Sequence, residues 1–217
     1  MTAPVLPDSN VLFSRTLRDW LCLLSAEGGL STVHMTEDIL AEVVSKYRDR
    51  FPYASGSQIE RLQRHLRDHA HSVFSDYQPR PCGIPDVGDH HVHAAAEDGK
   101  MAYLVTADRG FLDLPEEVTQ SFGYEIYSPD EFFCFADDSN PRGVRATAVE
   151  QALYWARKQD GVHSDGSLVD ALRRSGCPAF AERVAVHLDE ALRSPAPAGP
   201  QRFFIATPVE GSDPQGA

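Results

Sequence analysis

The chain has 217 residues, of which 42% are hydrophobic, and a formal net charge of −12. A chain of this length can fold around one sizeable core with a small appendage, and no stretch approaches the roughly 20 apolar residues of a membrane span. The first residues show no basic start followed by an apolar run, and the four cysteines form no CxxC pair. We therefore expect a cytoplasmic protein with reduced thiols, no signal peptide, no membrane contact and no zinc ribbon.

Strands and helices are predicted to alternate along the first part of the chain. A short strand at Val5 and Leu6 ends at Asp8. Apolar residues spaced three and four apart indicate four helices. The first contains Leu17 to Leu24, the second follows Thr36 as its N-cap, the third starts at Ser57 and the fourth runs from Pro85 to Gly99. Met101 to Thr106 is the clearest strand. Tyr124 to Tyr127 is a further strand, and Ser128 then caps a short helix.

This alternation predicts a three-layer α/β/α sandwich with a mainly parallel central sheet over residues 1–138. The composition changes after Phe135, and Asp137 to Pro141 is typical of a linker. Beyond it we expect a helical C-terminal extension over residues 145–193, with helices at 146–158, 167–174 and 179–192. Residues 194–217 are rich in Pro, Ala and Gly and are predicted to be a disordered tail.

Four acidic residues each close a short apolar run. They are Asp8 in VLPDSNVLF, Glu42 in TEDILAEVV, Asp89 in PDVGDHHVHAAA and Asp108 in YLVTADRGF. Sites in open α/β sheets form beyond the carboxyl ends of the strands. Asp8 and Asp108 follow strands, so we expect both at that edge, and the helices that carry Glu42 and Asp89 can reach it.

Clustered carboxylates need protons or a cation. Two of them about 4 Å apart repel by roughly 4 kcal/mol at an effective dielectric near 20. A cluster of four therefore takes up protons or binds a hard cation, and oxygen ligands suit Mg²⁺ or Mn²⁺. Hydrolysis of a phosphodiester is the chemistry that such a site favours.

The charge is spread unevenly along the chain. Residues 46–80 contain seven Lys or Arg and four acids, whereas residues 81–140 contain thirteen acids and two basic residues. The overall negative charge disfavours nucleic acid as a partner. A basic helical arm beside an acidic pocket would nevertheless suit a metal-dependent nuclease. The alternative is a solvated helix face that has no partner.

The motifs VLPDSNVL, TEDILAEV, GDHHVHAAA and LVTADRGF, in this order and at this spacing, resemble those of the PIN-domain ribonucleases. The likeness is closest to the VapC toxins of toxin–antitoxin modules and covers about residues 4–135. Gly176 to Ala181 is similar to the tail of a VapC subgroup that has an extra C-terminal helical segment. The resemblance implies metal-dependent endonucleolytic cleavage of RNA, a cognate antitoxin protein that covers the acidic pocket, and association as a homodimer.

The resemblance also implies roles for individual residues. The acidic quartet would be Asp8, Glu42, Asp89 and Asp108, with Asp8, Asp89 and Asp108 as ligands of Mg²⁺ or Mn²⁺. Asn10 and Thr106 match polar residues that support the quartet. Arg15 and Arg18 lie on the helix after Asp8, where they could contact RNA phosphate or an antitoxin. An ordinary surface role is the alternative for both arginines.

Some residues depart from this pattern or compete with it. Pro7 stands where the family has an apolar strand residue with a backbone N–H, so the first strand could be short or displaced. Asp86 competes with Asp89 for the third acid, but Asp86 has a structural role as a helix N-cap, which favours Asp89. His90, His91 and His93 could chelate Zn²⁺ with neighbouring acids. A structural role, pairing with those acids, is the interpretation that we favour.

Two other functions compete with the nuclease prediction. A catalytically silent PIN scaffold could bind RNA or protein, and the loss of one acid would favour it. A phospho-acceptor receiver domain also gathers acids at strand ends, but it needs a lysine after its last strand. Neither Lys46, Lys100 nor Lys158 has that position. We therefore predict a metal-dependent endoribonuclease, in which Asp8→Ala abolishes cleavage and leaves the fold intact.

Overall fold

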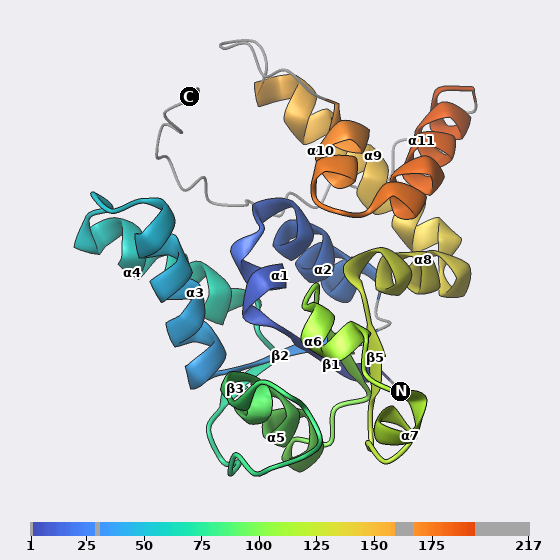
Figure 1. Ribbon diagram of the computed structural model, residues 1–217. Helices are drawn as coiled ribbons and strands as arrows, with labels where there is room; N and C mark the ends of the chain where they lie inside the picture. Colours follow the sequence, from blue (N-terminus) through green and yellow to red (C-terminus); the bar gives the residue numbers. More distant parts are fainter. Residues whose placement is uncertain (1, 29–30, 159–166, 194–217) are drawn as a thin grey trace.

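The computed structural model describes residues 2–28, 31–158 and 167–193. Within these residues, five parallel strands form one sheet in the order β3-β2-β1-β4-β5. Helices lie on both sides of the sheet, with α2 and α8 above it and α5 below it in the view of Figure 1. The predicted α/β sandwich with a parallel sheet is confirmed. The predicted disordered tail at 194–217 lies outside the described residues.

The sheet contains two strands that the sequence patterns did not predict. The strands are β1 (Ala3–Pro7), β2 (Ser31–Thr36), β3 (Ser72–Phe74), β4 (Tyr103–Val105) and β5 (Glu125–Tyr127). The unpredicted strands are β2 and β3. β2 alternates buried Val33 and Met35 with the half-buried Thr32 and His34, which is the period of two that a strand requires. β3 has only three residues, too few for any period to show.

The helices before β5 connect the successive strands of the sheet. They are α1 (Ser9–Phe13), α2 (Arg15–Gly28), α3 (Glu37–Arg50), α4 (Gly56–His69), the 3₁₀ helix η1 (Val87–Asp89), α5 (His90–Asp98), α6 (Arg109–Leu112) and α7 (Glu116–Thr119). Thr36 caps α3 as predicted, through a hydrogen bond from the backbone N–H of Ile39. The later helices are α8 (Pro129–Ser139), α9 (Pro141–Lys158), α10 (Leu168–Arg174) and α11 (Pro178–Arg193).

The linker predicted at Asp137 to Pro141 is wrong. Asp137 and Ser139 belong to α8, and Asn140 alone separates α8 from α9. Asp137 is 7% exposed and accepts hydrogen bonds from His187 and Arg183 of α11. Acidic residues are typical of linkers, but these acids bind basic side chains that lie some 50 residues further along the chain, and no local pattern shows such a pairing.

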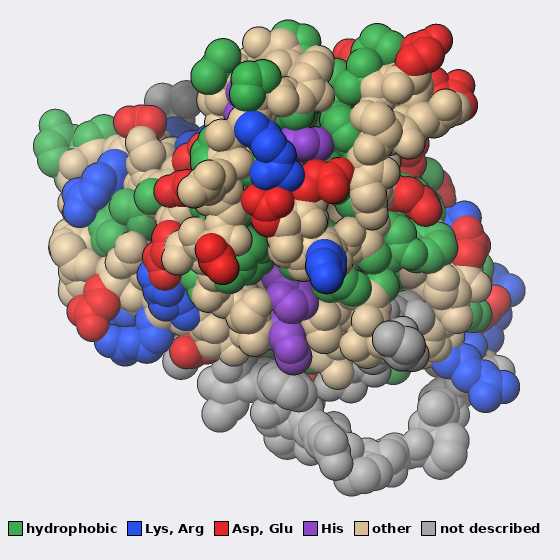
Figure 2. Space-filling model, turned by 90° about the horizontal axis from the view of Figure 1, so that it is seen from below, with side chains coloured by type: hydrophobic (Ala, Val, Ile, Leu, Met, Phe, Trp, Pro, Cys, Tyr) green, Lys and Arg blue, Asp and Glu red, His purple; other side chains and the backbone are tan. Residues whose placement is uncertain are grey.

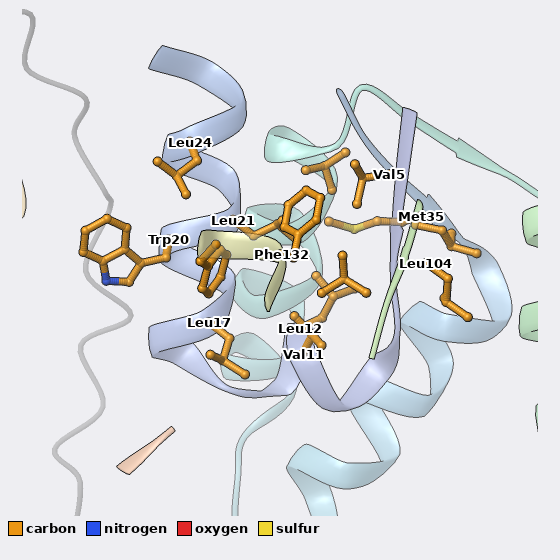
Figure 3. Close-up of a cluster of buried hydrophobic side chains, with 14 of the residues drawn as sticks. Val5, Val11, Leu12, Leu17, Trp20, Leu21, Leu24, Met35, Leu104 and Phe132 are labelled. Carbon is orange, nitrogen blue, oxygen red and sulfur yellow. The ribbon is translucent and has the colours of Figure 1, made fainter. Parts of the chain in front are cut away.

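Helix α2 is buried on two sides. Figure 3 shows Leu21 directed toward the strand residues Val5 and Leu104, whereas Trp20 points away from them. The ring of Trp20 instead meets Phe180 of α11 edge-on, with 4.9 Å between the ring centroids. One continuous core therefore joins the sheet to the C-terminal helices.

Candidate functional site

Asp8 lies directly after β1, at the carboxyl edge of the sheet. Pro7 is the last residue of that strand and pairs in register with Val105 of β4. The missing N–H of Pro7 does not displace Asp8, because the backbone N–H of Asp8 bonds to the carbonyl of Val105 at 2.9 Å. The predicted position of Asp8 at the strand end is therefore found.

The carboxylate of Asp8 is buried and fully hydrogen-bonded. It is 5% exposed. Its Oδ1 accepts from the backbone N–H and the hydroxyl of Ser9 at 2.5 and 3.1 Å. Its Oδ2 accepts from the amide of Asn10 at 2.6 Å and the hydroxyl of Thr106 at 2.7 Å. A carboxylate has about four acceptor positions, so these donors hold Asp8 in one orientation.

Asn10 and Thr106 connect the ends of β1 and β4. The side-chain oxygen of Asn10 accepts from the backbone N–H of Ala107 at 3.1 Å. The hydroxyl of Thr106, which is fully buried, accepts from the backbone N–H of Asp108 at 3.0 Å. Both side chains are thus used to join two strand ends, which fixes Asp8 relative to Asp108.

Asp108 and Asp89 approach each other around Gly110. Asp108 caps α6, because its Oδ1 accepts from the backbone N–H of Gly110 at 2.6 Å. A Cβ placed on Gly110 would lie 3.1 Å from Oδ1 of Asp108 and 3.4 Å from Oδ2 of Asp89. Asp89 precedes α5 and makes no side-chain capping bond there. A side chain at position 110 would crowd the space between these two carboxylates.

Glu42 comes close to the same region from α3 and lies beside a histidine. Nε2 of His91 lies 3.4 Å from Oε1 of Glu42, and Nδ1 of His91 bonds to the carbonyl of Gly88 at 2.7 Å. A carbonyl only accepts, so Nδ1 carries a proton in this bond. His91 therefore lies beside an acid on another helix, but its Nε2 makes no hydrogen bond among the described residues, and the two form an ion pair only when Nε2 is protonated as well.

The other two histidines of this motif do not face the acids. His90 bonds to the carbonyl of Ile84 at 3.0 Å, and the buried His93 bonds to the hydroxyl of Tyr124 at 2.8 Å. These contacts hold α5 against its neighbours. The zinc alternative gains no support from them.

The electrostatic environment of Asp89 shows that the acids converge. The pKa of Asp89 is raised from 3.8 to about 6, mainly by burial and then by the charges of Asp108, Asp86, Asp8 and Glu42, in that order. Every predicted member of the quartet, and the competing Asp86, thus acts on this one carboxyl group. Such repulsion is what protons or a bound cation relieve.

The raised pKa of Asp89 predicts a pH-dependent stability. The folded protein keeps the Asp89 proton up to about pH 6, whereas the unfolded chain releases it near pH 4. Stability from this group is therefore greatest at low pH and is lost as pH rises through about 6. Without metal, the wild type should lose roughly 1 kcal/mol more than Asp89→Asn between about pH 5 and about pH 7, after allowance for solvent screening. Urea unfolding in EDTA measures this, and equal losses would contradict it.

Asp86 has the structural role expected of it. Its Oδ1 accepts from the backbone N–H of Gly88 at 2.8 Å and caps η1. Asp89 has no such capping duty. This difference supports Asp89 over Asp86 as the third acid.

The two candidate arginines differ in exposure. Arg18 is 7% exposed, and its guanidinium donates to the carbonyl of Leu12 at 2.8 Å. It therefore holds α1 against α2, and neither the RNA contact nor the surface role considered for it matches this position. Arg15 has a side chain that is 49% exposed and pairs with Asp19 at 3.6 Å, which keeps it at the surface.

The predicted basic arm is partly neutralised. Arg64 pairs with Glu60, Arg67 with Glu37 and Arg80 with Asp98, at 2.6 to 2.9 Å. On the face shown in Figure 2, acidic side chains are interspersed with Lys, Arg and His. These observations favour the alternative of a solvated, mixed-charge surface for this stretch.

The donor set fits a hard divalent cation by its chemistry, since it offers carboxylate oxygens at one edge of the sheet. The geometry is less complete: in residues 2–28, 31–158 and 167–193, no three His, Cys, Asp or Glu side chains are arranged so that they could hold a metal ion. Asp8 in particular has its acceptor positions filled by protein donors. A cation would have to displace at least one of these donors to bind Asp8.

An apolar pocket lies away from the acidic residues. Its lining includes Ala3, Ser31 and Tyr103 at the starts of β1, β2 and β4, with Phe132 and Phe135 of α8. These residues mark the amino ends of the strands, opposite the edge that carries Asp8. The pocket is therefore separate from the candidate site.

The fold and the site define an α/β sandwich protein with an acidic cluster at the carboxyl edge of a parallel sheet. Comparison of the chain with protein-family models, curated proteins and solved structures finds no match. In the described part of the chain, no helix is long and apolar enough to cross a membrane.

Proposed function

We propose that the protein is a Mg²⁺- or Mn²⁺-dependent endoribonuclease. The observation that carries the proposal is the position of Asp89, whose pKa is raised by burial and then by Asp108, Asp86, Asp8 and Glu42. Carboxylates gathered at the carboxyl edge of a parallel sheet are placed where ligands of such sheets bind. The same order of motifs resembles the PIN-domain ribonucleases.

The residues of the site would have different roles in the proposed reaction. Asp8, Asp89 and Asp108 would hold the cation, which when bound lowers the pKa of a water molecule and neutralises charge on the phosphate. Hydrogen bonds from Thr106 and Gly110 orient Asp8 and Asp108. Glu42, which lies beside His91, would orient the attacking water. No covalent intermediate with the protein is part of this proposal.

A protein partner is proposed because of the charge of residues 81–140. Residues 81–140 contain thirteen acids and two basic residues, which suits a basic segment of a second protein. We propose that such a protein acts as an antitoxin that covers the carboxyl edge, with the nuclease as the toxin of the pair. Association as a homodimer belongs to the same proposal.

Asp89→Asn and Asp86→Asn provide a matched test. Each replaces an acid by its amide, and the two positions lie three residues apart at the edge of the site. We expect Asp89→Asn to lower the cleavage rate on the order of a hundredfold or more, because it removes a ligand, and Asp86→Asn to cost far less. The measurement is cleavage of total cellular RNA with Mg²⁺ or Mn²⁺, with new 5′ ends mapped by sequencing. The reverse ranking would move the third ligand to Asp86.

A catalytically silent scaffold that binds RNA or protein is the second candidate. The saturated hydrogen bonding of Asp8 favours it, because a carboxylate with four protein donors is a structural anchor. The same RNA assay separates the two functions. RNA that stays intact with every metal, from protein shown to bind the metal and to be free of any partner, would favour the scaffold.

A further inference from the structure

Lys46 reaches the end of β1 from α3. Its Nζ donates a hydrogen bond of 2.8 Å to the hydroxyl of Ser9, and that hydroxyl is 3.1 Å from Oδ1 of Asp8, to which it donates. Ser9 is 1% exposed, so this chain of hydrogen bonds lies inside the carboxyl edge. A lysine ammonium therefore stands one hydroxyl group away from the buried acid of the site.

The ammonium of Lys46 has N–H groups for which the described residues offer no acceptor. It has three N–H groups, and in the described part of the chain it makes one hydrogen bond, to Ser9, and no ion pair. Glu42 lies one turn earlier on the same helix and could have paired with it, but Glu42 faces His91 instead. Two N–H groups of Lys46 therefore remain for an oxygen ligand near Asp8.

A phosphodiester that approaches this edge meets several carboxylates, and their field repels it unless positive charge stands beside them. The guanidinium of Arg18 is buried and turned to a backbone carbonyl. Lys46 is half-buried, and a lysine binds phosphate as a point charge with rotatable donors. Its position beside Asp8 suits the backbone of the substrate that the acidic site would cleave.

We propose that Lys46 binds a non-bridging phosphate oxygen of single-stranded RNA at the acidic site and so sets the register of the backbone relative to Asp8. The choice of RNA as ligand rests on the proposed nuclease function. The contact itself is a property of binding, so it can be measured without cleavage. Ser9 holds the ammonium in place for this contact.

The test compares the full-length wild type with Lys46→Gln, Lys46→Arg and Lys100→Gln. Binding of a fluorescent single-stranded oligoribonucleotide is followed by anisotropy over a salt series, with Ca²⁺ as a hard cation and the RNA checked on a gel for integrity. Lys46→Gln should weaken binding roughly tenfold and reduce the slope of log affinity against log salt by about 0.7. Lys46→Arg should restore the slope because it keeps the charge.

Lys100→Gln is the matched control, since it removes the same charge at an exposed position between α5 and β4, and it should keep the wild-type slope. The proposal is overturned if Lys46→Gln and Lys100→Gln behave alike, or if Lys46→Arg loses the slope as Lys46→Gln does.

A parallel cleavage assay keeps this inference distinct from the nuclease proposal. Binding that depends on Lys46, in a protein that never cleaves RNA, supports the phosphate contact and rejects the nuclease. Cleavage by a protein whose RNA binding is indifferent to Lys46 rejects the contact and keeps the nuclease. A wild type that binds no RNA overturns both.

Discussion

Asp8→Ala is expected to abolish metal-dependent cleavage and to lower the free energy of unfolding by about 1–3 kcal/mol. Cleavage is lost because the variant lacks one of the proposed ligands. Stability falls because Asp8 is buried and accepts four hydrogen bonds, and alanine leaves those donors without an acceptor. The sequence alone predicted that this variant keeps its fold. The hydrogen bonds of Asp8 lead us to expect, in addition, that the folded variant is less stable.

The measurement combines the RNA assay with urea unfolding of the same preparation. Asp113→Ala is the control: it removes an exposed acid that pairs with Arg109 on α6, and it should change neither cleavage nor stability noticeably. Assays at a temperature where Asp8→Ala is fully folded separate lost chemistry from lost structure. A folded Asp8→Ala that still cleaves RNA would remove Asp8 from the site.

Phe180→Ala is expected to lower the free energy of unfolding by about 3–5 kcal/mol, the usual range for a buried phenylalanine. Phe180 is fully buried between Trp20 of α2 and Phe133 of α8, at centroid distances of 4.9 and 5.2 Å. Its backbone N–H also bonds to Asp130 at 2.8 Å. The cavity therefore opens where the C-terminal helices meet the sandwich.

Because one core spans both parts, the loss should appear as a single cooperative transition at lower urea concentration, followed by far-UV circular dichroism. Val186→Ala on the same helix is the control, since Val186 is 57% exposed, and its effect should stay within about 0.5 kcal/mol. Two separate transitions for Phe180→Ala, one of them unchanged, would show that α9 to α11 unfold independently of the sheet.

Local patterns predicted the elements that position the site. An apolar run that ends in an acid placed Asp8 directly after β1 and Asp108 three residues after the end of β4. The capping roles of Thr36 and Asp86 were also predicted, since a cap depends on residues only two or three positions away. The strand β2 was not predicted because it carries polar residues on its less buried face, and β3 was not predicted because it is very short.

Several contacts that the sequence did not reveal join residues far apart in the chain. Lys46 to Ser9, His91 to Glu42 and Asp137 to His187 each join different helices or strand ends. Arg18 was expected at the surface and lies buried, because the carbonyl that it binds becomes available only when α1 packs against α2. No periodic pattern carries information about such pairs.

The sequence by itself determined the class of fold and the edge of the sheet that carries the acids, and the preference for Asp89 over Asp86 stays a prediction. These follow from chain order and from interactions within a few residues. Only the tertiary structure decided that Asp8 is saturated with donors, that a lysine stands beside it and that the C-terminal helices share its core. Those properties depend on which side chains meet once the helices pack, and packing is a property of the whole chain.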